Sequence, residues 1–180
     1  MDAQHSLLKH FLATIAYRTQ KALRNAPDTF ANFRAGTTVR TPHELVWHMT
    51  GVIGYARTFF HPGKWQPEAM PTFAEEIHRF HELLDDLGRL LESETPHPNI
   101  SAEQLLQGPL ADTLTHAGQL AMLRRLSGSP VPPENFIHAT VQASNLSENQ
   151  SQPAAPDPGW SPEQPPKPPG RGLPKRWYNT

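Results

Sequence analysis

The 180-residue sequence contains no cysteine. This absence excludes disulfide bonds, thiolate metal ligands, iron–sulfur clusters and a cysteine nucleophile, so any metal ion must be bound by histidine and carboxylate side chains. A large excess of charge of either sign is also lacking, since 16 Lys and Arg against 17 Asp and Glu give a formal net charge of −1. A nearly neutral chain has no broad basic surface, and we therefore expect no nucleic-acid partner.

Long hydrophobic runs are missing as well. No stretch of the sequence approaches the roughly 18 unbroken apolar residues of a transmembrane helix, and residues 1–5 lack the basic and apolar segments of a signal peptide. We therefore expect a cytoplasmic protein with no membrane partner. The length is typical of one domain with a substantial tail, or of two very small domains at most.

Histidine and proline are abundant, with 10 and 20 residues. Twelve prolines lie between residues 130 and 180, and eight lie in the first 129 residues. This difference divides the chain into a domain over residues 1–128 and a Pro-rich, extended tail over residues 129–180. Because Phe136 and Trp160 can anchor an extended segment, we expect the tail to wrap around the domain to about residue 160. The order of residues 161–180 is left open.

Apolar residues recur every three or four positions in four stretches of residues 1–128, a pattern that predicts amphipathic helices. The first stretch begins near residue 3 and stops before Pro27, which cannot continue a helix. The other three begin at capping boxes, in which a Thr or Ser and the Glu or Gln three residues later bond each other's backbone amides. These stretches cover residues 41–60, 72–91 and 101–128.

The last of these stretches is apolar nearly all round, which is typical of a central helix. Gly108-Pro109 within it indicates either a kink or a restart of the helix. Four helices with no strand-like alternation between them predict an all-α fold, a four-helix bundle.

A candidate metal site joins two of the predicted helices. His48 lies three residues after Leu45 and four before Val52, at the edge of the apolar stripe, where a ring is either a hydrogen-bonded core histidine or a ligand. Asp112 and His116 are four residues apart, so they share a helix face and form either a hydrogen bond or a chelating pair. Together the three offer a His, His, carboxylate set with at least one open position, as in catalytic zinc and non-haem iron sites.

Other polar residues are weaker candidates. Tyr55 and Gln119 are spaced to point into the same cavity, where they would contact a substrate or orient a ligand, although packing explains them equally well. His78 and His81 have ligand-like spacing, but the pattern favours a solvated helix face for both. Residues 166–171 have the PxxPxR form that aromatic grooves bind, and an extended tail is the simpler interpretation.

Two segments resemble a known family. Residues 112–120, Asp-Thr-Leu-Thr-His-Ala-Gly-Gln-Leu, look like the last bundle helix of the DinB/YfiT-like superfamily, which carries a His, three residues, then His-x-Gly-Gln-Leu. Residues 41–49 resemble the first ligand helix of that family. The resemblance covers residues 4–128, leaves out the tail, and implies a DinB-like four-helix bundle.

The resemblance also implies a metal. In this family three histidines bind a divalent ion, often zinc or nickel; His48 and His116 match two of them, and Asp112 replaces the third. A carboxylate oxygen is a competent but harder ligand, so iron and manganese are alternatives to zinc and nickel.

Characterised members of the superfamily include thiol S-transferases and isomerases that use bacterial low-molecular-weight thiols. The resemblance therefore implies a bacterial metal-dependent transferase or hydrolase that activates a thiol or water and takes a small-molecule substrate, together with a homodimer formed through helices. A stress-related role linked to DNA follows from the family name alone, and the near-zero net charge opposes DNA contact.

A different class of function stays open. The chain would then be a non-catalytic bundle with a vestigial polar cluster, acting as a binding protein through its tail or a helix face. The sequence names neither the substrate nor the metal.

Overall fold

A computed structural model describes residues 3–61, 63–93, 100–157 and 159–163. Among these residues the structure contains helices and no β-strand, apart from one isolated β-bridge between Glu134 and Pro156. The all-α class expected from the sequence is therefore confirmed. The elements in chain order are α1 (Ala3–Leu23), η1 (Asp28–Asn32), α2 (Pro42–Arg57), α3 (Phe73–Glu92), α4 (Ala102–Leu105), η2 (Leu106–Leu110), α5 (Ala111–Leu126) and η3 (Phe136–His138).

The helix starts follow the capping boxes. Thr41 accepts a hydrogen bond from the Glu44 amide, and the Glu44 carboxylate accepts one from the Thr41 amide, which fixes the first turn of α2. The boxes at the starts of α3 and α4 are formed in the same way. Beyond α5, Gly128 has a φ of 77°, a left-handed conformation that suits glycine after a helix end.

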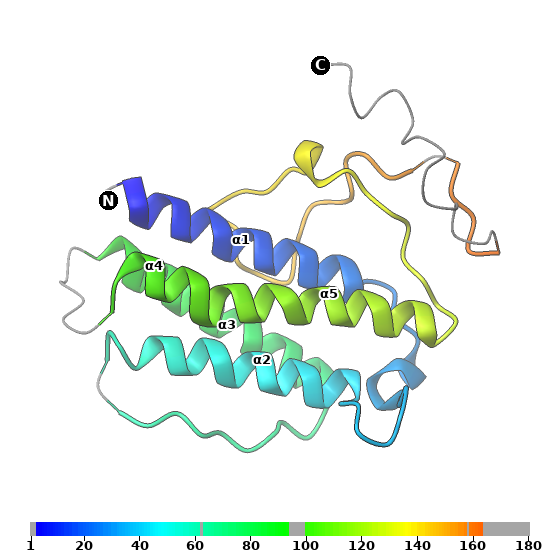
Figure 1. Cartoon of the computed structure of the whole chain (residues 1–180), viewed down its shortest axis with the longest axis horizontal. Helices are drawn as coiled ribbons and strands as arrows, with labels where there is room; N and C mark the ends of the chain where they lie inside the picture. Colours follow the sequence, from blue (N-terminus) through cyan, green and yellow to red (C-terminus); the bar gives the residue numbers. More distant parts are fainter. Residues whose placement is uncertain (1–2, 62, 94–99, 158, 164–180) are drawn as a thin grey trace.

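The four long helices lie side by side (Figure 1). Helices α1 and α5 run in one direction, and α2 and α3 run in the opposite direction. Residues 58–61 and 63–72, between α2 and α3, return along the length of α2, and we call them the crossover segment. Helix α1 packs on α3 and α5, and α2 packs on the same two helices. This arrangement makes α2 and α5, which carry the three candidate metal ligands, direct neighbours.

The core is formed by the apolar stripes of all four long helices. Leu12, Ile53, Leu84 and Leu120 are each fully buried in it. Helix α5 is not central, however, because Met122 and Leu126 on its outer face are 60% and 57% exposed. The expectation of a central helix is therefore wrong: α5 occupies a corner, and apolar side chains at a surface are common in folded proteins.

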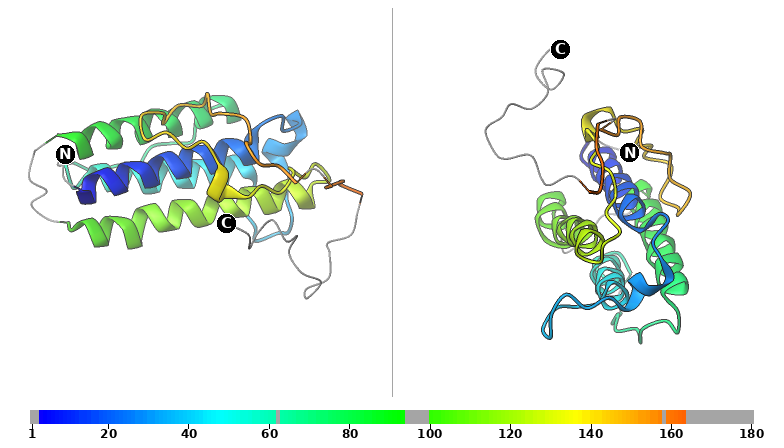
Figure 2. Two further views of the ribbon diagram at one scale, coloured as in Figure 1. Left: turned by 90° about the horizontal axis from the view of Figure 1, so that it is seen from above. Right: turned by 90° about the vertical axis from the view of Figure 1, so that its right-hand side faces the viewer.

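The described part of the chain after α5 packs over α1 and α3 (Figure 2). Leu146 is buried against Gly88 of α3, where a Cβ atom would collide with the leucine side chain. The Tyr17 hydroxyl of α1 donates a 2.7 Å hydrogen bond to buried Glu134. Residues 164–180, with the proline motif at 166–171, lie outside the described residues. Within the described part of the chain, every helix is too short or too polar to cross a bilayer.

Candidate metal centre

The structure brings together the three residues that sequence spacing selected. His48 comes from α2, and Asp112 and His116 come from consecutive turns of α5. One nitrogen or oxygen atom from each lies within 4.8 Å of the others, and the two imidazole rings meet edge to face with centroids 4.8 Å apart. The described residues contain no other such group of His, Asp and Glu. The cluster is able to hold a metal ion.

One hydrogen bond of His116 bears on which nitrogen carries a lone pair. Its Nδ1 lies 2.9 Å from Oε1 of Gln119, and because a carbonyl oxygen only accepts, a hydrogen bond there requires the tautomer with the hydrogen on Nδ1. In the neutral ring, Nε2 then presents a lone pair. This atom is buried, has no hydrogen-bond partner, and lies 3.3 Å from Oδ1 of Asp112. Two acceptors that face each other repel unless a cation, either a proton or a metal ion, lies between them.

His48 also favours the ligand-competent state. Burial lowers the pKa of His48, and the nearby charge of Arg40 and the His116 ring lower it further, whereas Asp112 acts in the opposite direction. The imidazole of His48 is therefore neutral near pH 7, and a neutral ring has a lone pair for a metal ion.

A π-helical turn precedes Asp112, the acidic residue of the cluster. Segment η2 contains Pro109 and joins α4 to α5 without a break, so Gly108-Pro109 distorts the helix rather than restarting it. The Thr113 hydroxyl donates a 2.7 Å hydrogen bond to the Pro109 carbonyl and satisfies it. Such π turns accommodate an extra residue within a helix and are frequent at functional sites. Here the turn ends directly before the helix that presents Asp112.

A groove of about 1230 Å³ lies beside the cluster. His48 and Asp112 line it, whereas His116 does not line it and has only 10% of its side chain exposed. Helix α2, the segment before it, the π-helical turn and the crossover segment form the walls. None of the described residues after α5 lines the groove. The groove is also lined by Arg34, Arg40, Glu44, Trp47, Val52, Tyr55, Trp65, Pro67 and Glu68.

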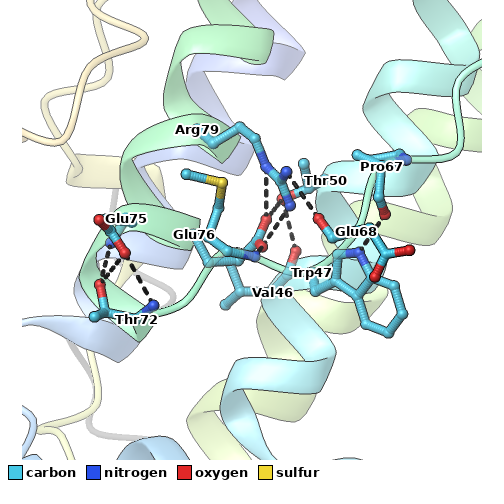
Figure 3. A network of polar contacts seen from close by, with 10 residues as sticks. Val46, Trp47, Thr50, Pro67, Glu68, Thr72, Glu75, Glu76 and Arg79 are labelled. Carbon is cyan, nitrogen blue, oxygen red and sulfur yellow. Dashed lines mark hydrogen bonds and ion pairs between the residues drawn. The ribbon is translucent and has the colours of Figure 1, made fainter.

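A buried carboxylate holds the crossover wall in place (Figure 3). Glu76 of α3 accepts hydrogen bonds of 2.6 Å from the Thr50 hydroxyl of α2 and 2.9 Å from the Met70 amide of the crossover segment. Arg79 pairs with Glu76 and also donates to the backbone carbonyl of Glu68. One fully buried acid thus ties α2, α3 and the crossover segment together.

Two further contacts position aromatic rings in this wall. The Trp47 indole nitrogen donates a 3.0 Å hydrogen bond to the Pro67 carbonyl (Figure 3). The Trp65 indole lies directly on Gly54 of α2, where even a Cβ atom would overlap it. Neither ring was distinguishable from core residues in the sequence, because Trp65 belongs to the crossover segment, which has no periodic pattern, and Trp47 contacts that same segment.

The two additional residues expected near the site have different positions. Gln119 is exposed and bonds His116, as described above. Tyr55 lines the groove but is 56% exposed, and its ring packs edge to face on Phe59 with centroids 5.0 Å apart. Gln119 therefore contacts a candidate ligand directly, whereas Tyr55 faces the space where a substrate would lie.

The expectation of a solvated face for both histidines of α3 is half wrong. His78 is exposed, and its bond to Glu148 raises its pKa. His81 is 3% exposed: its Nδ1 donates to the Leu146 carbonyl at 2.7 Å, and its Nε2 accepts from Gln20 at 3.0 Å. Burial lowers the pKa of His81. The C-terminal segment covers this ring, and periodicity within α3 carries no information about that cover.

Comparison of the chain with models of protein families, with curated proteins and with solved structures finds no match in any of the three. The candidate site therefore rests on its own geometry.

Proposed function

We propose that the chain is a DinB/YfiT-like four-helix bundle that binds a divalent metal ion through His48, Asp112 and His116. The observation that carries this proposal is the pair of facing acceptors, His116 Nε2 and Asp112 Oδ1, 3.3 Å apart with no donor between them. A cation bound by both would relieve their repulsion. The α2 and α5 arrangement and the resemblance at residues 112–120 support the same assignment.

The donor set fits a borderline transition metal. Two imidazole nitrogens and one carboxylate oxygen suit zinc, nickel, iron or manganese better than calcium or magnesium, which prefer oxygen ligands alone. Gln119 would orient His116 from the second coordination shell, as partners of metal-bound histidines commonly do. Three protein ligands leave at least one coordination position open, which favours a reactive site over a purely structural one.

The proposed activity is that of a metal-dependent transferase or hydrolase. A divalent ion at this position would supply Lewis acidity and lower the pKa of a water or a thiol. The groove would admit a small-molecule substrate to the exposed side, where His48 and Asp112 lie. The reactive sulfur of a transferase would belong to a low-molecular-weight thiol, because the chain has no cysteine of its own.

Metal content tests the proposal most directly. Protein without an affinity tag is loaded with zinc, nickel, iron(II) or manganese in turn, freed of excess metal and measured by elemental analysis. We expect about one equivalent of metal in the wild type and a large reduction in Asp112→Asn and in His116→Ala. Asp28→Asn, which changes an exposed acid of η1, is the matched control and is expected to keep the metal.

Two results would contradict the proposal. If the wild type takes up none of the four metals, the cation between Asp112 and His116 is a proton and the cluster is a hydrogen-bonded pair. If Asp112→Asn and His116→Ala retain as much metal as Asp28→Asn, the ion binds elsewhere. The first result would leave a non-catalytic binding protein as the better interpretation.

A further inference from the structure

The open side of the candidate metal centre faces the groove. His48 and Asp112 contribute to the groove wall, whereas buried His116 does not. An ion held by all three residues would therefore have protein on its buried side and its free coordination positions toward the groove. A molecule in the groove would reach the ion without any rearrangement of the helices.

The two arginines of the groove have different surroundings. Arg34 is held in place, since one nitrogen of its guanidinium lies 3.2 Å from the Glu44 carboxylate and another donates to the Val39 carbonyl. Arg40, in contrast, forms no hydrogen bond or ion pair with any other described residue. Arg40 therefore lines the groove as an exposed positive charge without an ion-pair partner among the described residues. A guanidinium binds a carboxylate through two parallel hydrogen bonds, which makes a carboxylate its best-fitting anion.

The other side chains of the groove favour one kind of group attached to such a carboxylate. Trp47 is 39% exposed and Tyr55 is 56% exposed, so both offer ring surface to a ligand, and Val52 lies between them in sequence on the same helix. The bond from Trp47 to Pro67 holds the indole in place before any ligand arrives. Rings and apolar side chains of this kind favour a planar, apolar body.

The carboxylate of Glu68 also lines the groove, from the crossover segment. It forms no ion pair with another described residue, so it would repel a second negative charge on the ligand. A ligand with one carboxylate satisfies Arg40 without this repulsion. A phosphate or a dicarboxylate fits less well.

We infer that the groove binds a small aromatic or apolar monocarboxylate, whose carboxylate pairs with Arg40 while its body contacts Trp47 and Tyr55. This inference names the substrate class of the proposed function and rests on it for the reacting end of the molecule. The carboxylate pairing itself needs no metal.

Fluorine NMR with two matched probes tests the inference. The full chain, both metal-free and loaded with zinc, is titrated with 4-fluorobenzoate and with 4-fluorobenzamide, which has the same shape and no charge. We expect 4-fluorobenzoate to bind more tightly than the amide, and Arg40→Gln to weaken its binding about tenfold or more, because the lost hydrogen bonds are charge-assisted. Arg125→Gln, on the exposed face of α5 and outside the groove, is expected to bind like the wild type.

The outcomes separate this inference from the metal proposal. Equal affinity for the two probes, or an unchanged affinity in Arg40→Gln with a native circular dichroism spectrum, would overturn the carboxylate site even if zinc binds. Benzoate binding that depends on zinc and not on Arg40 would overturn it as well. Arg40-dependent binding in a protein that takes up no metal would support the carboxylate site and remove the metal-dependent activity.

Discussion

Replacement of Gln119 by alanine should weaken metal binding without disturbing the fold. The side chain is exposed, and its described contact is the 2.9 Å bond from Nδ1 of His116. Without that acceptor, the ring is free to carry its hydrogen on Nε2 and donate it to Asp112, 3.3 Å away. The metal would then have to displace a proton from the atom that it needs as a ligand.

The size of the effect follows from binding linkage. Loss of a second-shell partner costs about 10- to 100-fold in metal affinity. At a free metal concentration of 100 times the wild-type Kd, the wild type gains about 2.7 kcal/mol, whereas the variant gains between about 1.4 and about 0.4 kcal/mol. Each kcal/mol shifts the Tm of a domain of this size by roughly 2–4 °C. The metal-induced rise should thus fall from roughly 5–11 °C to roughly 1–6 °C.

Differential scanning calorimetry with and without zinc measures these shifts, and isothermal titration gives the two Kd values directly. Gln119→Glu keeps an acceptor at the same position and should retain the wild-type shift. Gln142→Ala, at an exposed position far along the chain, controls for the loss of a glutamine side chain. The reasoning fails if Gln119→Ala binds zinc with wild-type affinity, since the bond to His116 would then have no influence on the ligand.

Two further predictions concern stability. Gly54→Ala should lower the free energy of unfolding by about 1–3 kcal/mol relative to Gly51→Ala, as measured by urea denaturation, and should expose Trp65. The reason is that a Cβ atom at residue 54 overlaps the indole, whereas one at residue 51 meets nothing. Equal stabilities of the two variants would refute this packing. Burial lowers the pKa of His81, so below about pH 6.5 the unfolded chain takes up a proton before the folded chain does. The wild type should therefore lose stability as the pH falls, by up to about 1.4 kcal/mol per pH unit from this group. Between pH 7.5 and 5.5, His81→Gln should lose less free energy of unfolding than the wild type. The control His138→Gln, at an exposed position, should behave like the wild type.

The helices could be predicted because their signals are local. The capping box at Thr41 and Glu44 involves residues three apart, and it sets the start of α2 and hence the face on which His48 lies. Asp112 and His116 were found together for the same reason, since one helical turn separates them. Their meeting with His48 required a longer step, which rested on placing His48 at the edge of an apolar stripe and on the resemblance of residues 41–49 and 112–120 to a known family.

The remaining features depend on segments that are distant in sequence. Glu76 lies three residues after Phe73 and four before Phe80, on the buried side of α3, and its carboxylate is satisfied there by the Thr50 hydroxyl and the Met70 amide of the crossover segment. His81 is covered by Leu146, 65 residues further along the chain. Helix periodicity describes one face of one helix, so it cannot indicate which irregular segment will lie over the opposite face.

The distribution of the three ligands over α2 and α5 has a mechanical consequence. His48 and Asp112 are 64 positions apart in the sequence, and both α3 and the crossover segment lie between them. A metal ion coordinated by both residues would close that long loop, and closure of long loops removes the most conformational entropy from an unfolded chain. In a protein without cysteine, such an ion would be a reversible cross-link, which a chelator or acid releases as a reductant releases a disulfide.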